Sequence, residues 1–485
     1  MTGLRLCLRL LCLAPHRLRI LAEIQAVSPP LGLEEITLCA LPLTAAVVRS
    51  IAAAAPRLSI LDLHSYHMSY CTGLPGSLPY SPTLSGVQGL LRHAAPHLQQ
   101  LTLCDISGMS GASELQAEPH GLAPLLLRCS RLESLDLYIT RTNAATVSFC
   151  SGVLSTLAQL PAMRSLEMGG SLAPDAGRTL DVPPGLTQLT RLVIEAAIDL
   201  DAAMPALARM RGLAELRFPS HQLQPSHMRQ LAALTALTRL EVQGIGAADV
   251  PSPEGTAELG SLPAPAPQML VPLPALLQEL HLWDAPSPSV LAALQLPSGP
   301  LRLQLPGIWV PAADKGADGC LRESAAEALL AACRQLAGRL WEDTDEWSPF
   351  QLDLGGAAPP LSWPDGWGTL FAALRPAAMR HLAIQAASLT LYDVDALVRH
   401  LPLLERLSGL ELHPEKGGLV GGWDSQLALR AALLVLCAEA PSLADVTIFV
   451  DGAEEPLLEA ALQAVDWLSQ ELPTLRDDPP SVRVE

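Results

Sequence analysis

Residues 98–103 read LQQLTL and residues 132–137 read LESLDL, and the same spacing of apolar residues returns as MRSLEM at 163–168 and LTRLVI at 189–194. In each stretch the first, fourth and sixth positions are apolar. The fourth and sixth positions enclose a fifth position that is usually polar, which is the periodicity of a β-strand with one buried face. These stretches therefore predict short strands that recur along the chain.

The spacing occurs in fourteen places, at intervals of 23 to 49 residues. The clear copies begin at Leu33, Leu58, Leu98, Leu132, Met163, Leu189, Leu213, Leu237, Leu277, Met379, Leu407 and Leu443. Two degenerate copies begin at Pro300 and Pro349. A repeat array explains how a chain of 485 residues manages with only 4% aromatic residues, because stacked units need no single large core.

The segments between the strands have helical character, as at 44–56 (TAAVVRSIAAAAP) and 324–340 (SAAEALLAACRQLAGRL). A strand, a helix and the next strand at this spacing give parallel strands joined by right-handed crossovers. We therefore expect an α/β fold, a right-handed solenoid with irregular repeats. Its parallel strands should line the concave face and its helices the convex face.

The units resemble leucine-rich repeats of the ribonuclease-inhibitor-like and F-box-associated type over residues 31–460. The more specific sign is a Pro or Cys shortly before the strand, such as Pro96 before Leu98 and Cys129 before Leu132. The resemblance implies a protein-binding scaffold. The alternative it implies is the substrate-recognition subunit of a cullin-type ubiquitin ligase with its adaptor segment diverged or missing, since no F-box is visible before Leu33.

The loops depart from that family. Its repeats usually place Asn or Cys three residues after the last apolar strand position, where the side chain satisfies loop backbone groups. Residues such as His221 and Ile245 hold this position here. We therefore expect no polar ladder and irregular loops.

The array divides by composition into five parts. An N-terminal segment, 1–32, is followed by repeats at 33–243 and a Pro/Ala/Gly-rich insertion or linker at 244–275. Degenerate repeats fill 276–460 and contain a Trp-rich insertion at 307–368. A C-terminal cap and tail occupy 461–485.

Cellular location is predicted from two features. Ten cysteines are scattered in apolar surroundings with no CxxC pair, which is typical of a reducing compartment and favours the cytoplasm. The N-terminal segment carries Arg5 and Arg9 but no acidic residue before Glu23, a pattern also found in organelle transit peptides. A transit peptide and a capping unit are both open interpretations of residues 1–32.

Several functional classes lack their signatures. The net charge of −18 opposes binding to nucleic acid or anionic lipid, and no apolar run is long enough to cross a membrane. The sequence has no GxxxxGK[ST] or GxGxxG phosphate loop and no GxSxG nucleophile elbow. We predict no enzyme activity, cofactor or metal, and a protein partner, for which the charge permits a basic segment.

The candidate partner-binding residues lie first at the fifth position of the repeats, which points out of the sheet. They are Asp62, Asp136, Glu167, Arg217, Glu241 and His281. The mostly acidic row could receive a basic segment, with charge setting orientation and association rate. Ordinary solvated charge is the alternative interpretation.

A second candidate surface is the group Trp341, Trp347, Trp363 and Trp367, because tryptophan is enriched at binding hot spots. All eight tryptophans lie at or after Trp283, so the C-terminal half differs in composition from the N-terminal half. Local core packing in place of eroded repeats is the alternative.

Overall fold

The computed structural model describes residues 4–8, 33–39, 43–64, 84–104, 122–138, 144–169, 181–196, 198–246, 270–340, 350–354, 357, 360, 362–363, 366–374, 377, 379–386, 399, 409–414, 426–439, 442–449, 455–475 and 479–484. The chain forms two compact units. The first comprises Met1–His221, Arg229–Leu240 and Pro274–Leu276, and the second comprises Gln222–Met228, Glu241–Leu273 and Leu277–Glu485.

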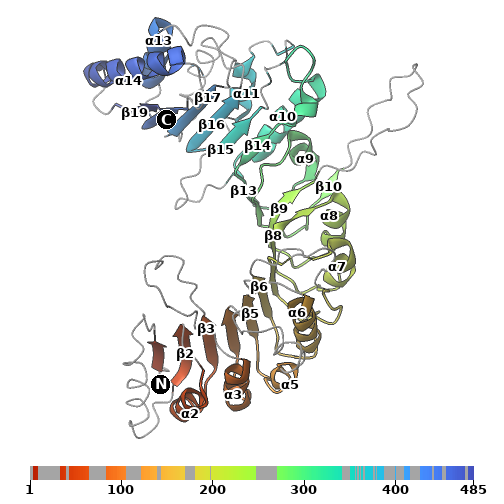
Figure 1. Cartoon of the computed structure of the whole chain (residues 1–485). Coiled ribbons are helices and arrows are strands. Elements are labelled where there is room, and N and C mark those ends of the chain that lie inside the picture. The colour runs from red at the N-terminus through yellow and green to blue at the C-terminus, as the bar shows by residue number, and fades with distance from the viewer. Residues whose placement is uncertain are drawn as a thin grey trace, which may run out of the picture. The chain divides into compact units, whose positions relative to one another are not determined.

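The first unit is a row of parallel strands whose order follows the chain. The strands are β1 (Leu4–Leu8), β2 (Leu33–Cys39), β3 (Ile60–His64), β4 (Gln100–Cys104), β5 (Ser134–Tyr138), β6 (Ser165–Gly169), β7 (Arg191–Ile194) and β8 (Glu215–Leu223). The helices are α2 (Ala45–Ala54), α3 (Leu84–Ala94), α5 (Ala123–Leu126), α6 (Ala144–Leu157) and α7 (Leu200–Leu207). The strands line the inner side of an arc and the helices cover its outer side, as a leucine-rich-repeat solenoid requires (Figure 1).

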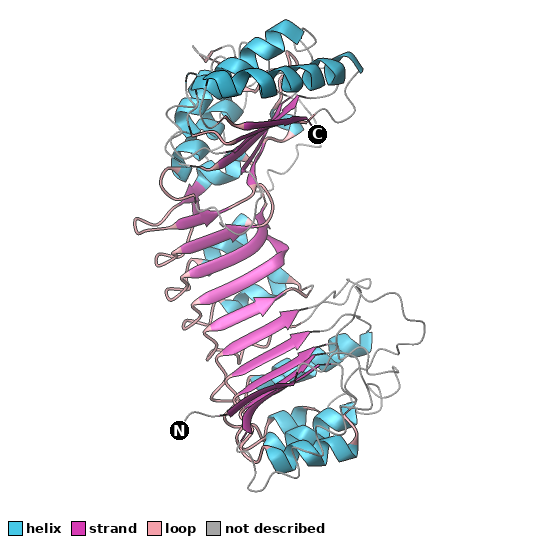
Figure 2. Ribbon diagram, turned by 90° about the vertical axis from the view of Figure 1, so that its left-hand side faces the viewer, coloured by secondary structure: helices cyan, strands magenta, loops and turns pink. Residues whose placement is uncertain are grey.

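Strands β4 to β8 each begin with the same pair of backbone hydrogen bonds. The carbonyl of the second position in one repeat accepts from the amides of the second and third positions in the next repeat. The carbonyl of Glu133, for example, accepts from Arg164 at 2.8 Å and Ser165 at 2.9 Å. A hydroxyl adds a further bond at three junctions between repeats, where Ser59, Thr190 and Thr238 each donate to the carbonyl of the second position in the preceding repeat. The strands are therefore held in one register along the unit (Figure 2).

The core lies between the strands and the helices and is built by the apolar positions of the repeat. In the unit that begins at Leu132, the side chains of Leu132, Leu135 and Leu137 are all at most 1% exposed. The same three positions are buried in the units that begin at Leu98 and Met163. The predicted strand periodicity is confirmed.

Two helices of the first unit, α2 and α7, begin with side-chain caps. Thr44 accepts from Val47 N at 3.3 Å ahead of α2, and Asp199 accepts from Ala202 N at 3.1 Å ahead of α7. These oxygens satisfy amides that have no partner inside a helix. The first turns of α2 and α7 are therefore stabilised by residues that the sequence places directly before them.

The second unit continues the alternation of strand and helix. Its main elements are β9 (Arg239–Ile245), β11 (Glu279–Leu282), α9 (Pro288–Ala293), β13 (Arg302–Gln304), β14 (Gly307–Trp309), α10 (Glu323–Leu336), β15 (Phe350–Asp353), α11 (Trp367–Leu374), β16 (His381–Ala386), β17 (Gly409–Pro414), α13 (Gln426–Glu439), β18 (Asp445–Ile448), α14 (Glu455–Leu475) and β19 (Ser481–Val484). Strands β14 to β19 form a six-stranded parallel sheet in chain order. The short strands β10 (Val271–Pro272) and β12 (Leu294–Gln295) pair separately, helix α8 (Pro225–Leu231) spans the division between the units, and the 3-10 turn η2 (Ala312–Asp314) follows β14.

The structure corrects one expected interruption of the array. Residues 307–368 are predicted to be a Trp-rich insertion, but they supply strands β14 and β15 to the parallel sheet, with helix α10 between them. The six-residue spacing does not reveal β14, which has only three residues. The degenerate copies at Pro300 and Pro349 are confirmed as β13 and β15.

The ends of the predicted array also contain strands. β1 lies within the segment 1–32 and pairs in parallel with β2, with Leu6 opposite Ile36. β19 lies within the segment 461–485 and pairs with β18. Both therefore extend the repeat sheets.

The expected lack of a polar loop ladder is wrong at His221. Its Nε2 accepts from the backbone N of Ile198 at 3.2 Å, so the imidazole satisfies a loop amide of the preceding unit. Burial lowers the pKa of His221, which keeps the accepting nitrogen unprotonated. The ring packs edge-on against Phe218 with centroids 5.7 Å apart.

Among the described residues, none of the helices has both the length and the apolar character needed to cross a membrane.

The assignment of buried and exposed faces is testable at β5. Leu135→Ala should lower the free energy of unfolding by about 2–5 kcal/mol, because a side chain that is 1% exposed leaves a cavity behind. Glu133→Ala is the matched control two residues earlier, where the side chain is exposed, and should change it by less than about 0.5 kcal/mol. Urea denaturation measures both, and equal losses would refute the assignment.

Candidate functional site

The fifth positions of the repeats form one row across the sheet of the first unit. Asp62 of β3 lies opposite Thr102 of β4, which lies opposite Asp136 of β5, and Asp136 lies opposite Glu167 of β6. The row continues through Val193 to Arg217 of β8. The structure therefore brings together four of the predicted residues, Asp62, Asp136, Glu167 and Arg217.

The carboxylate of Asp136 has few hydrogen-bond partners in this row. Its Oδ2 accepts from the Thr102 hydroxyl at 3.4 Å, and its Oδ1 is buried and accepts no hydrogen bond among the described residues. Burial raises the pKa of Asp136, and the charge of Glu167 raises it further, while Arg191 opposes the shift. The ionised form of Asp136 is therefore held at a cost to stability.

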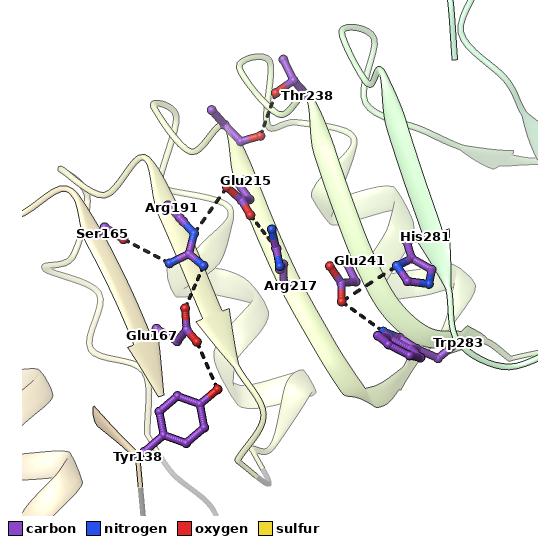
Figure 3. A network of polar contacts seen from close by, with 11 residues as sticks. Tyr138, Ser165, Glu167, Arg191, Glu215, Arg217, Thr238, Glu241, His281 and Trp283 are labelled. Atoms are coloured by element: carbon purple, nitrogen blue, oxygen red, sulfur yellow. Dashed lines mark hydrogen bonds and ion pairs between the residues drawn. The ribbon is translucent and has the colours of Figure 1, made fainter. Parts of the chain in front are cut away.

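Glu167 is the centre of a polar network that crosses three strands (Figure 3). Arg191 of β7 donates to Glu167 Oε2 at 2.7 Å and lies 3.4 Å from Glu215 of β8. Arg217 donates to the same Glu215 at 2.5 Å. The two guanidiniums neutralise part of the row, so its acidic character is concentrated toward Asp136 and Asp62.

Tyr138 closes the network from the adjacent row. Its hydroxyl lies 3.2 Å from Glu167 Oε1 and 3.5 Å from Glu195 Oε1, and donates to them. Burial and the two glutamate charges raise the pKa of Tyr138, so the phenol keeps its proton. The ring lies over Gly169, where an added Cβ would fall 2.5 Å from ring carbons. Glycine at this position therefore makes room for the ring.

The second unit holds a smaller cluster on β9 and β11. Glu241 is only 6% exposed, and its Oε1 accepts from Trp283 Nε1 at 3.1 Å and lies 3.9 Å from His281 Nδ1. The His281 and Trp283 rings stack with centroids 4.6 Å apart and an interplanar angle of 30° (Figure 3). The predicted residues Glu241 and His281 thus meet around Trp283, which is 48% exposed.

The predicted tryptophan patch is only partly visible. Trp341 and Trp347 lie outside the described residues, and Trp363 is half-buried. Trp367 is 1% exposed and stacks on Phe371 at 5.7 Å inside α11. Its assignment to a contact surface is therefore corrected, because the ring is part of the core.

The residues that the sequence argument missed share one position. Tyr138, Gly169, Glu195 and Trp283 all follow directly after the six-residue pattern, at a seventh position. Strand alternation places this position on the same face as the third and fifth. Extending the period by one step would have found them.

No group of three or more His, Cys, Asp or Glu side chains among the described residues could hold a metal ion. The face presents carboxylates, guanidiniums and a phenol in fixed contacts.

No protein-family model matches the sequence, and no curated protein matches it significantly. Chains of solved structures do match, among them a chain from the crystal structure of a TLR13–ssRNA13 complex, with 13% identity and a TM-score of 0.25. The alignment covers 86% of this chain and 42% of that chain, so the present protein spans less than half of its length. A likeness at this TM-score carries no argument about function.

The burial of Asp136 predicts that its replacement by Asn raises the free energy of unfolding in a pH-dependent way. Asp136→Asn should raise the free energy of unfolding at neutral pH by about 0.5–2 kcal/mol, the usual range for a stabilising substitution, because it removes a half-buried charge and keeps an acceptor for Thr102. Folding raises this pKa, so the penalty in the wild type is full above the raised value and is relieved as the pH falls through it. Thermal unfolding should show the advantage of Asn disappearing as the pH approaches 3.8, the ordinary pKa of Asp.

The close contact between the Tyr138 ring and Gly169 is tested by adding a methyl group at Gly169. Gly169→Ala should cost about 1–3 kcal/mol, since the methyl group either shifts the strand or displaces the ring from Glu167. Gly212→Ala is the control, because its Cβ would meet only the carbonyl oxygen of Leu189, at 3.9 Å. Denaturant unfolding of the two variants should differ clearly, and a Gly169 variant as stable as the control would contradict the close fit.

Proposed function

We propose that this protein is a non-catalytic scaffold that binds a partner protein through the strand face of its first unit. The observation that carries the proposal is the register-aligned row of Asp62, Asp136 and Glu167, in which one carboxylate oxygen of Asp136 is buried without a hydrogen bond among the described residues. Charges that destabilise a fold are concentrated at functional sites, because binding and not folding maintains them.

The partner segment that fits this row is basic. Carboxylates outnumber guanidiniums in the row, where Arg217 is accompanied by Asp62, Asp136 and Glu167. Arg191 and Arg217 are already engaged with Glu167 and Glu215. An incoming lysine or arginine would reach Asp136 and Asp62 at the more acidic end of the row. Charge complementarity of this kind mainly raises the association rate and makes it dependent on salt.

The proposal is tested with two labelled peptides of equal charge, nona-arginine and nona-lysine, measured by fluorescence anisotropy. The combined variant Asp62→Asn, Asp136→Asn and Glu167→Gln should weaken both peptides by about tenfold, from roughly 0.5 kcal/mol for each exposed charge contact. The slope of affinity against salt concentration should fall with it.

The matched control removes three exposed carboxylates from helices, through Glu323→Gln, Glu327→Gln and Glu459→Gln. Its net charge equals that of the row variant, so only the location differs. If the two variants bind both peptides with the same affinity and salt slope, the row is not the binding site.

A ubiquitin-ligase substrate-recognition role is the alternative proposal, together with the finer ribonuclease-inhibitor-like or F-box-associated repeat type. Its support is the strand entry at Cys129, which is buried and whose carbonyl accepts from Leu132 N at 2.9 Å. Affinity purification of the tagged chain separates the two roles. Reproducible recovery of a cullin adaptor would favour the ligase.

A further inference from the structure

Trp283 is a half-exposed aromatic side chain on a strand face that is otherwise polar. It follows β11 directly and is 48% exposed. Single exposed apolar side chains are ordinary on protein surfaces, so the exposure of Trp283 alone implies no function. The fixed position of its ring and the carboxylate bonded to its indole distinguish it from an ordinary exposed side chain.

The ring is fixed before any ligand arrives. Its Nε1 donates to Glu241 at 3.1 Å, His281 stacks against it at 4.6 Å, and its backbone N donates to the carbonyl of Val242 at 3.1 Å. A side chain held in this way loses little conformational entropy when a partner binds. Trp283 therefore offers a rigid contact surface.

The surroundings of the ring are negative. Glu241 is buried, so its charge is poorly screened, and its hydrogen bond to the indole N–H shifts electron density onto the ring. Asp284 is exposed next to Trp283, with Oδ2 3.7 Å from the Cβ position of Gly244. An electron-rich ring face beside two carboxylates attracts a cation.

We propose that Trp283 is the seat for an arginine side chain of the partner. A guanidinium stacks flat on an indole and can still direct its N–H groups to a carboxylate such as Asp284, whereas the compact ammonium of lysine cannot do both. The inference rests on the proposed function for the basic character of the partner, and adds a preference for arginine over lysine.

The test uses the ratio of nona-arginine to nona-lysine affinity in the full chain. Trp283→Leu should lower this ratio by about 3- to 10-fold, the range expected for one cation–π contact. Trp283→Phe should keep part of the preference, and Glu241→Gln should reduce it while retaining an acceptor for the indole. Trp309→Ala is the control, since Trp309 is 47% exposed on the other sheet of the unit.

A direct readout comes from 5-fluorotryptophan NMR, with the Trp283 signal assigned by its loss in Trp283→Leu. The arginine peptide should shift this signal, and a nona-citrulline peptide, which is flat but uncharged, should not. An unchanged affinity ratio in Trp283→Leu, or a Trp283 signal that responds to an oligosaccharide and not to the arginine peptide, would overturn the inference.

The two proposals fail separately. If the carboxylate row is wrong, its variant binds both peptides like the helix control, while the arginine preference can persist. If the arginine seat is wrong, the preference is the same in wild type and Trp283→Leu, while the row variant still weakens both peptides.

Discussion

The fold of the first unit depends on one recurring hydrogen-bond arrangement, in which a single carbonyl at the second position of a repeat accepts two successive amides of the next repeat. The carbonyls of Gln99, Glu133, Arg164, Thr190 and Ala214 all do this in the first unit. Because the bonds always start at the same repeat position, they align every later position of the strand as well. The burial of leucine at the first, fourth and sixth positions and the rows of side chains at the third, fifth and seventh positions follow from this alignment.

The alignment brings polar residues that are far apart in the sequence together on one surface. Residues 24 to 57 positions apart, such as Arg191 with Glu167 and Tyr138 with Glu195, meet because they hold equal or adjacent places in their strands. The ion pairs are partly exposed, so each adds modestly to stability. Their larger effect is to fix the directions in which the charges of the face point.

The two clusters use the same strand geometry for different chemistry. In the first unit, Tyr138 lies over Gly169 and donates to Glu167, whose charge, together with burial, disfavours the ionised form of Asp136. In the second unit, the seventh position holds Trp283, whose indole N–H is taken by buried Glu241 while much of the ring stays exposed. The cluster of the first unit holds partly buried carboxylates, and the cluster of the second unit presents a fixed aromatic ring.

The sequence by itself determined the strand positions of the clear repeats, their parallel order and the fifth-position row, because a period of two around leucine anchors has one stable arrangement in a stacked repeat. It also indicated the degenerate strands at Pro300 and Pro349. It did not reveal β1, β14 or β19. Only the tertiary structure decided which polar side chains pair. The burial of Glu241 and Trp367, the placing of Tyr138 over Gly169 and the bond from Ile198 to His221 depend on what neighbouring strands and helices put beside them. Contacts across strands are set by three-dimensional spacing, and the irregular intervals between the repeats conceal that spacing in the linear chain.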